Sequence, residues 1–106
     1  MSASAASTKA QVESIIDENP VALFSKSYCP YCRSSKRLLT ELGASFYVVE
    51  LDQVDDGSDI QSALATMTGQ STVPNIFIGK KHIGGNSDLQ RRKGELPELL
   101  RAAGAV

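Results

Sequence analysis

The stretch Cys29-Pro30-Tyr31-Cys32 holds the only two cysteines of this 106-residue chain. It follows the apolar run Val21-Ala22-Leu23-Phe24, which is typical of a strand covered on both faces, and Pro30 suits the first turn of a helix. Two thiols three residues apart on that turn lie about 5–6 Å from each other, a separation that a disulfide accepts. The pair can therefore be oxidised and reduced without refolding of the chain, which favours redox chemistry.

The spacing of the two cysteines is also compatible with two other uses, a zinc site and a purely structural disulfide. A structural zinc site needs four ligands, and His82 is the only histidine that could add a nitrogen, so the sequence predicts no metal site. A purely structural disulfide would close a loop of four residues, which removes only about 2 kcal/mol of chain entropy. Redox chemistry is the better use of these two sulfurs.

The two cysteines are expected to differ in their surroundings. Cys29 precedes the helix, where unpaired N–H groups and the positive end of the helix dipole favour a thiolate, and Lys26 is close in sequence. Cys32 lies one turn further along, where we expect it to be more buried and protonated. This asymmetry predicts that Cys29 is the attacking nucleophile and Cys32 the resolving thiol.

Composition favours one soluble domain, with 42% hydrophobic residues and a formal net charge of −1. The balance of 11 Lys and Arg against 12 Asp and Glu disfavours nucleic acid or an anionic membrane as the main partner. No apolar run approaches the roughly 18–20 residues of a membrane span. Residues 1–7 lack the basic start and apolar core of a signal peptide, so we expect a flexible N-terminal tail and a cytoplasmic location, with organelle import as the minor alternative.

The remaining chain, residues 8–106, is predicted to form a single domain. A strand, a helix and a second strand follow one another, which implies a parallel pair with a right-handed crossover. Gly79-Lys80 has glycine where a type II′ hairpin turn requires it, so the flanking strands are antiparallel. Helices are expected at 8–18, from Pro30 to Gly43, from Ser58 to Gly69, from Asn86 to about Arg92 and after Glu95, and strands at 21–25, 46–51, 75–78 and 81–83.

Three separated motifs occur together in a fixed order. They are Lys26-Ser27-Tyr28-Cys29-Pro30-Tyr31-Cys32, Thr68-Gly69-Gln70-Ser71-Thr72-Val73-Pro74-Asn75 and Ile83-Gly84-Gly85-Asn86-Ser87-Asp88-Leu89. From about Gln11 to Gly104 the chain resembles the dithiol glutaredoxins. The resemblance implies the α/β thioredoxin fold, a four-stranded mixed sheet flanked by about five helices, and a glutathione-dependent thiol–disulfide oxidoreductase.

The resemblance also implies a groove for glutathione beside the thiols. Pro74 would have a cis peptide bond, and the backbone of Val73 would pair with the cysteinyl part of glutathione like an added strand. Ser71 departs from the pattern, since glutaredoxins often carry a basic residue there. The implied glutathione-binding residues are Lys26, Tyr31, Gln61, Thr72, Val73, Pro74, Ser87 and Asp88.

The two ends of this groove have separate implied roles. Lys26 and Gln61 match positions that bind the glycine carboxylate of glutathione, although Gln61 also suits a local capping box with Ser58. Ser87 and Asp88 match the γ-glutamyl end, where helical N–H groups can receive the carboxylate and Asp88 can accept from the ammonium. The same two residues also suit a purely local role as helix caps.

The predicted enzyme reduces glutathione mixed disulfides and protein disulfides through Cys29, and Cys32 resolves the protein mixed disulfide. Glutathione is the reductant and co-substrate, and no tightly bound cofactor is expected. The expected partners are glutathione and proteins that are glutathionylated or contain disulfides. The protein is expected to act as a monomer and to bind neither nucleic acid nor a membrane.

Two rival functions remain at this point. A thioredoxin served by its own reductase would share the fold, but the central pair Pro30-Tyr31 and the charged groove residues disfavour it. An iron–sulfur carrier would join two subunits through one cysteine each and two glutathiones. Relatives specialised for that work usually have a single active-site cysteine and a less rigid residue after it, so Pro30 and Cys32 disfavour this reading.

Overall fold

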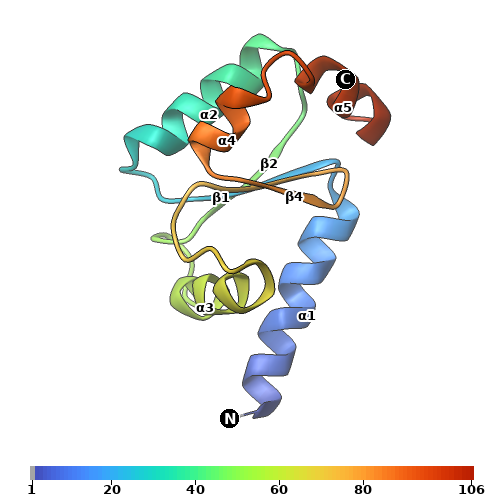
Figure 1. The fold of residues 1–106 in the computed structure, drawn as a ribbon. Helices are drawn as coiled ribbons and strands as arrows, with labels where there is room; N and C mark the ends of the chain where they lie inside the picture. The colour runs from blue at the N-terminus through green and yellow to red at the C-terminus, as the bar shows by residue number, and fades with distance from the viewer. Residues whose placement is uncertain (1) are drawn as a thin grey trace.

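A four-stranded mixed sheet with the strand order β2-β1-β3-β4 lies at the centre of the molecule (Figure 1). The computed structural model describes residues 2–106, with side chains from residue 7 onward. Strand β1 (Val21–Ser25) pairs parallel with β2 (Tyr47–Glu50) and antiparallel with β3 (Asn75–Ile78), and β3 pairs antiparallel with β4 (Lys81–Gly84). The predicted mixed sheet is confirmed, including its parallel first pair.

Five helices in residues 2–106 cover the two faces of this sheet. Figure 1 shows α1 (Ser2–Glu18) and α3 (Gly57–Thr68) on one face, and α2 (Pro30–Glu41), α4 (Asn86–Arg91) and α5 (Leu96–Ala103) on the other. None of the helices in this part of the chain is long and apolar enough to cross a membrane.

Strand β1 supplies side chains to a hydrophobic core on each face. Val21 and Leu23 belong to the core under α2, α4 and α5, whereas Ala22 and Phe24 belong to the core under α1 and α3. This division follows from the strand geometry, in which successive side chains point to opposite faces. All five residues of β1 are buried, so the chain reaches the cysteines from a strand that is fixed on both sides.

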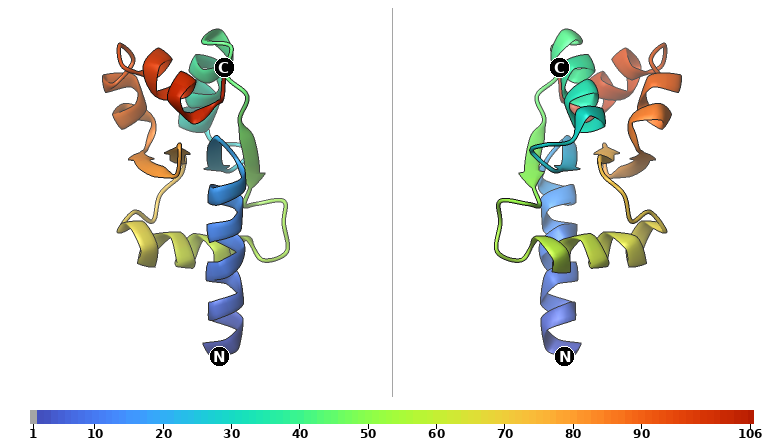
Figure 2. Two further views of the ribbon diagram at one scale, coloured as in Figure 1. Left: turned by 90° about the vertical axis from the view of Figure 1, so that its right-hand side faces the viewer. Right: turned by 90° about the vertical axis from the view of Figure 1, so that its left-hand side faces the viewer.

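The first helix begins at Ser2, not at the predicted start, Thr8. Residues 2–7 are serines and alanines without glycine or proline, so nothing in their backbone chemistry stops the helix. Residues 2–7 of the expected tail are therefore helical, and Figure 2 shows this end of α1 extending away from the sheet. The flexibility of the tail and the domain boundary at residue 8 stay predictions.

The hairpin between β3 and β4 has a different turn from the predicted one. Gly79 has φ 57° and Lys80 has φ 70°. Positive φ at both central residues defines a type I′ turn, whereas type II′ requires it only at the first. Glycine at the first position satisfies both types, so the sequence predicted the hairpin correctly and its turn type wrongly.

Candidate active site

The two cysteines lie at the start of α2, as predicted. Cys29 is the extended residue that caps the helix, and its Sγ accepts a hydrogen bond from the backbone N–H of Cys32 at 3.2 Å. This contact places the backbone N–H of the first helical turn directly against the Cys29 sulfur. Both cysteines are free thiols, with Cys29 half-buried and Cys32 fully buried.

Burial also changes the acidity of the second thiol, Cys32, from that of an exposed cysteine. Removal from water raises the pKa of the Cys32 thiol, and its hydrogen bond with Cys29 acts in the same direction. Cys32 is therefore held in its neutral form inside the first turn of α2. The accessible sulfur of the pair belongs to Cys29.

Alkylation of the reduced protein with iodoacetamide below neutral pH is expected to mark Cys29 before Cys32. Cys29 has the more accessible sulfur. Only a thiolate reacts rapidly with the reagent, and the raised pKa of Cys32 disfavours its thiolate. Mass spectrometry of the peptides measures the order, and a Cys29→Ser variant serves as the control that should stay unlabelled over the same time. Equal labelling of the two cysteines would contradict this assignment.

A groove with a volume of about 590 Å³ lies beside this thiol pair. Six of the eight predicted binding residues line it, drawn from three segments of the chain that are far apart in sequence. The lining consists of the predicted Tyr31, Thr72, Val73, Pro74, Ser87 and Asp88 together with Gln70, Gly85 and Asn86, which the sequence analysis did not select. Gln70, Gly85 and Asn86 all lie within the quoted motifs, and that position is the signal that could have identified them.

The segment around Pro74 forms one wall of the groove. The Val73–Pro74 peptide bond is cis, as the resemblance implied. The carbonyl oxygen of Val73 lies 4.0 Å from Cys29 Sγ, so this backbone segment faces the accessible sulfur. A peptide-like molecule in the groove would therefore lie against Val73 and the thiol at once.

Lys26 and Gln61 do not line this groove. The side chain of Gln61 donates from Nε2 to the carbonyl of Ser71 at 2.7 Å, and α3 begins at Gly57. The local capping box predicted from Ser58 is therefore wrong, because the helix begins before it. Lys26 is half-buried, and its carbonyl accepts the Cys29 N–H at 3.0 Å, which tightens the loop before the thiol.

Asp88 closes the far end of the groove with its carboxylate already partly engaged. Its Oδ2 accepts the N–H of Gly85 at 2.9 Å, and its Oδ1 pairs with Arg91. The Gly85 N–H is the main reason that the pKa of Asp88 is lowered. Gly84 has φ 119°, and a Cβ there would lie 2.3 Å from Asp88 Oδ2, so glycine leaves room for this ionised carboxylate.

One supporting contact was not found from the sequence. Asp52 follows β2, and its Oδ1 accepts the backbone N–H of Ser27 at 2.9 Å while its Oδ2 accepts the Ser27 hydroxyl. These two bonds, the hydroxyl first, lower the pKa of Asp52. They tie the loop that precedes Cys29 to the segment between β2 and α3, although the sequence analysis did not single out Asp52.

Taken with the sheet topology, a capping thiol, a buried partner thiol and a cis-proline wall define a thiol–disulfide oxidoreductase of the thioredoxin fold. Residues 21–83, more than half of the chain, match the glutaredoxin family model. A glutaredoxin from Solanum lycopersicum is 57% identical over 99 residues, covering 92% of each chain. The chain belongs to the glutaredoxin family and is a glutathione-dependent oxidoreductase.

Two solved structures agree with the fold of this chain. The crystal structure of a buckwheat glutaredoxin–glutathione complex has a TM-score of 0.97 at 41% identity and covers 100% of this chain and 98% of its own. A wheat glutaredoxin has a TM-score of 0.91 at 52% identity, covering 94% of this chain and 98% of its own. The predicted thioredoxin fold is confirmed.

Proposed function

We propose that this protein reduces glutathione mixed disulfides and protein disulfides, with glutathione as the reductant. The observation that carries the proposal is the half-buried Cys29 sulfur, which caps α2 and faces the backbone of Val73 across the groove. The buckwheat relative crystallised with glutathione adds support for the same ligand here. The proposed setting is a monomer in the cytoplasm, with glutathionylated and disulfide-containing proteins as partners and no tightly bound cofactor.

The reaction with a glutathione mixed disulfide needs only Cys29. Its thiolate attacks the glutathionyl sulfur, a new disulfide forms between Cys29 and glutathione, and the substrate leaves as a thiolate that takes up a proton. A second glutathione thiolate then attacks the glutathionyl sulfur on Cys29. Oxidised glutathione leaves, and the Cys29 thiolate is regenerated with its hydrogen bond from Cys32.

A protein disulfide requires both cysteines. Cys29 attacks one substrate sulfur and forms a mixed disulfide while the other substrate sulfur leaves. Cys32 then loses its proton and attacks the sulfur of Cys29, which releases the reduced substrate and leaves a disulfide between the two cysteines. Two glutathiones reduce that disulfide in turn. Burial raises the pKa of Cys32, so it starts as a neutral thiol and gives up its proton in this second step.

Glutathione is proposed to lie along the groove with its cysteinyl backbone against Val73. Its γ-glutamyl end reaches Ser87 and Asp88, where the ionised Asp88 carboxylate can accept from the ammonium. Its glycine carboxylate extends toward Lys26 and Gln61, beyond the groove lining. A ligand charged at both ends is thereby held at both ends.

Two assays run side by side test this function. Reduction of a small glutathione mixed disulfide by glutathione is expected to be rapid, whereas reduction of insulin with thioredoxin reductase as the electron source is expected to be slow. The reverse pattern would identify a thioredoxin. The absorbance spectrum of anaerobically purified protein tests the iron–sulfur alternative in the same preparation.

Lys26→Ala and Gln61→Ala are each expected to weaken the apparent affinity for glutathione several-fold, with little change in thermal stability. A single polar contact with a carboxylate near the protein surface is worth about 1 kcal/mol, which corresponds to a several-fold change in affinity. Steady-state kinetics against glutathione concentration measures the effect, and Lys9→Ala on the exposed face of α1 is the matched control. Unchanged kinetics in both variants would remove the two residues from the site.

A further inference from the structure

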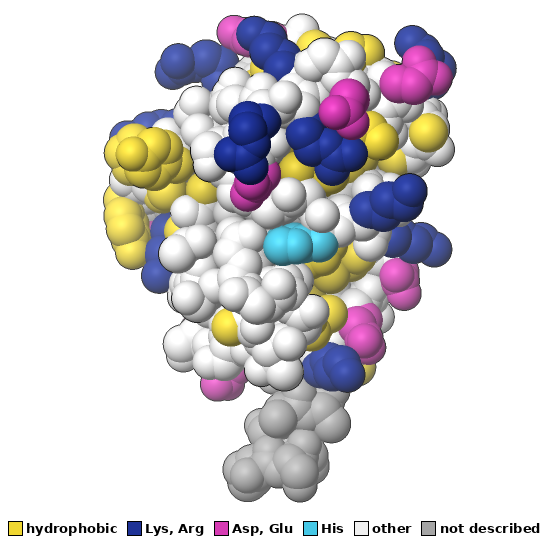
Figure 3. All heavy atoms as spheres, viewed as in Figure 1, with side chains coloured by type: hydrophobic (Ala, Val, Ile, Leu, Met, Phe, Trp, Pro, Cys, Tyr) yellow, Lys and Arg dark blue, Asp and Glu magenta, His cyan; other side chains and the backbone are white. Residues whose placement is uncertain are grey.

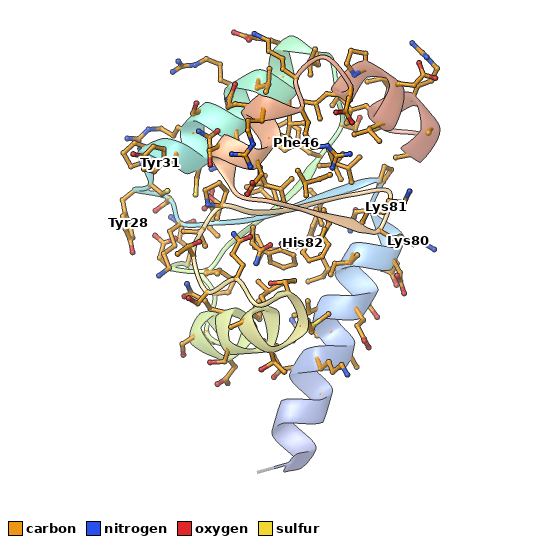
Figure 4. The ribbon with its side chains drawn as sticks, in the orientation of Figure 1. Tyr28, Tyr31, Phe46, Lys80, Lys81 and His82 are labelled. Atoms are coloured by element: carbon orange, nitrogen blue, oxygen red, sulfur yellow. The ribbon has the colours of Figure 1, made fainter. Side chains whose placement is uncertain are left out.

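The single histidine of the chain takes no part in the chemistry described so far. His82 projects from β4 toward the α3 side of the sheet (Figure 4) and reaches the surface (Figure 3). Its ring lies 5.1 Å from the ring of Phe77, centre to centre, at an interplanar angle of 47°. This packing places the imidazole of His82 against the Phe77 ring.

Gln70 connects this histidine to the wall of the groove. Gln70 Nε2 donates to the carbonyl of Thr72 at 3.1 Å and to the carbonyl of Pro74 at 2.9 Å. Carbonyl oxygens only accept, so the Gln70 amide must place its nitrogen there and its oxygen on the other side. That Oε1 lies 3.2 Å from His82 Nε2, which also lies 2.8 Å from Asn75 Oδ1.

The same argument fixes the tautomer of His82. Gln70 Oε1 accepts, and the two carbonyls fix its position, so Nε2 carries the proton and donates to it, while Asn75 Oδ1 at 2.8 Å accepts the same proton. Burial lowers the pKa of His82, against the nearby Asp88 that raises it. A neutral His82 ring with its proton on Nε2 can therefore make all of these hydrogen bonds.

We propose that Gln70 and His82 are positioning residues that hold the Thr72–Pro74 segment in the shape that glutathione requires. The side-chain amide of Gln70 donates to the carbonyls on both sides of Val73, and the carbonyl of Val73 itself faces Cys29. From β4, His82 donates to the oxygen of the same amide and so keeps the amide in place. This inference rests on the proposed use of glutathione. Gln70 lines the groove, whereas His82 does not, so any effect of His82 on glutathione use must pass through its neighbours.

Four variants test the chain of contacts. Gln70→Ala removes the amide that donates to both carbonyls without adding a charge to the groove, and His82→Ala removes the donor behind it. His82→Gln restores an N–H near the position of Nε2. Lys81→Ala, an exposed neighbour on β4, is the matched control.

The readout is KM against kcat for a glutathionylated peptide, with thermal unfolding measured in parallel. Loss of one or two neutral hydrogen bonds predicts a rise in KM of about fivefold for Gln70→Ala and about threefold for His82→Ala, with kcat unchanged. His82→Gln should return KM toward the wild-type value, and Lys81→Ala should not change it. A double variant Gln70→Ala, His82→Ala should have the same KM as Gln70→Ala alone, because the two act in series.

Wild-type KM in Gln70→Ala and His82→Ala would overturn this inference, and so would a fall in melting temperature without any change in KM. Failure of His82→Gln to restore KM, where His82→Ala raises it, would overturn the role of the Nε2 donor. If the wild-type protein itself does not turn over the glutathionylated peptide, the proposed function fails first and this inference fails with it.

Discussion

Cys29→Ser is expected to abolish reduction of both glutathione mixed disulfides and protein disulfides. Cys29 is the accessible sulfur, it lies within 4.0 Å of the Val73 carbonyl, and the one other cysteine is fully buried. A serine hydroxyl cannot form the mixed disulfide through which either reaction passes. Activity should fall to the uncatalysed background, because no other sulfur in the chain can replace it.

Cys32→Ser is the matched variant and should separate the two reactions. Reduction of a glutathione mixed disulfide should survive, because external glutathione resolves the intermediate on Cys29. Reduction of protein disulfides that need an internal resolving thiol should fall strongly. Mass spectrometry of this variant after treatment with oxidised glutathione should find one glutathione, on Cys29. If Cys32→Ser is as inactive as Cys29→Ser toward glutathione mixed disulfides, the one-cysteine mechanism is wrong.

Gly57→Ala is expected to cause the largest loss of stability among the glycine substitutions. A Cβ at Gly57 would lie 1.8 Å from the backbone carbonyl oxygen of Leu51, so the chain between β2 and α3 would have to move. Forcing extra volume into such a contact destabilises by about 1–3 kcal/mol, and a backbone partner that cannot rotate away places this site at the upper end. Urea unfolding of the variant measures the loss.

Gly94→Ala is the control for this prediction, since a Cβ at Gly94 meets nothing within 4 Å. Its free energy of unfolding should stay close to that of the wild type. A Gly57→Ala variant as stable as Gly94→Ala would show that the segment between β2 and α3 yields easily. Because Asp52 in that segment holds Ser27, a displaced segment should also lower the activity of Cys29.

The sequence predicted those elements whose signals are local. The bounds of β1 were correct because an apolar run ends at a polar loop, and Pro30 marked the first residue of α2. The start of α1 was wrong because alanine favours a helix and neither alanine nor serine stops one, so the helix extends N-terminal of Thr8. Local sequence signals therefore predicted the order of the helices and strands more accurately than the residues at which they begin and end.

The site residues that the sequence predicted correctly lie in the three motifs quoted from it. Cys29, Cys32 and the cis bond at Pro74 followed from the spacing and the family resemblance. The bond from Asp52 to Ser27 joins residues 25 positions apart, and no pattern in either segment indicates it. The role of His82 was missed for the same reason, because its partner Gln70 lies on a different segment.

The N-cap of α2 is a sulfur whose charge would change in every cycle of the proposed mechanism. While Cys29 is a thiolate, the N–H of Cys32 points at an anion, and when Cys29 is bound to glutathione the same N–H faces a neutral atom. The hydrogen bond in the first turn of α2 is therefore stronger when Cys29 is a thiolate and weaker when Cys29 is part of a disulfide. By thermodynamic linkage, whatever the helix contributes to the thiolate also stabilises the reduced protein. Amide exchange at Cys32 and the reduction potential of the pair are therefore two measurements of one interaction.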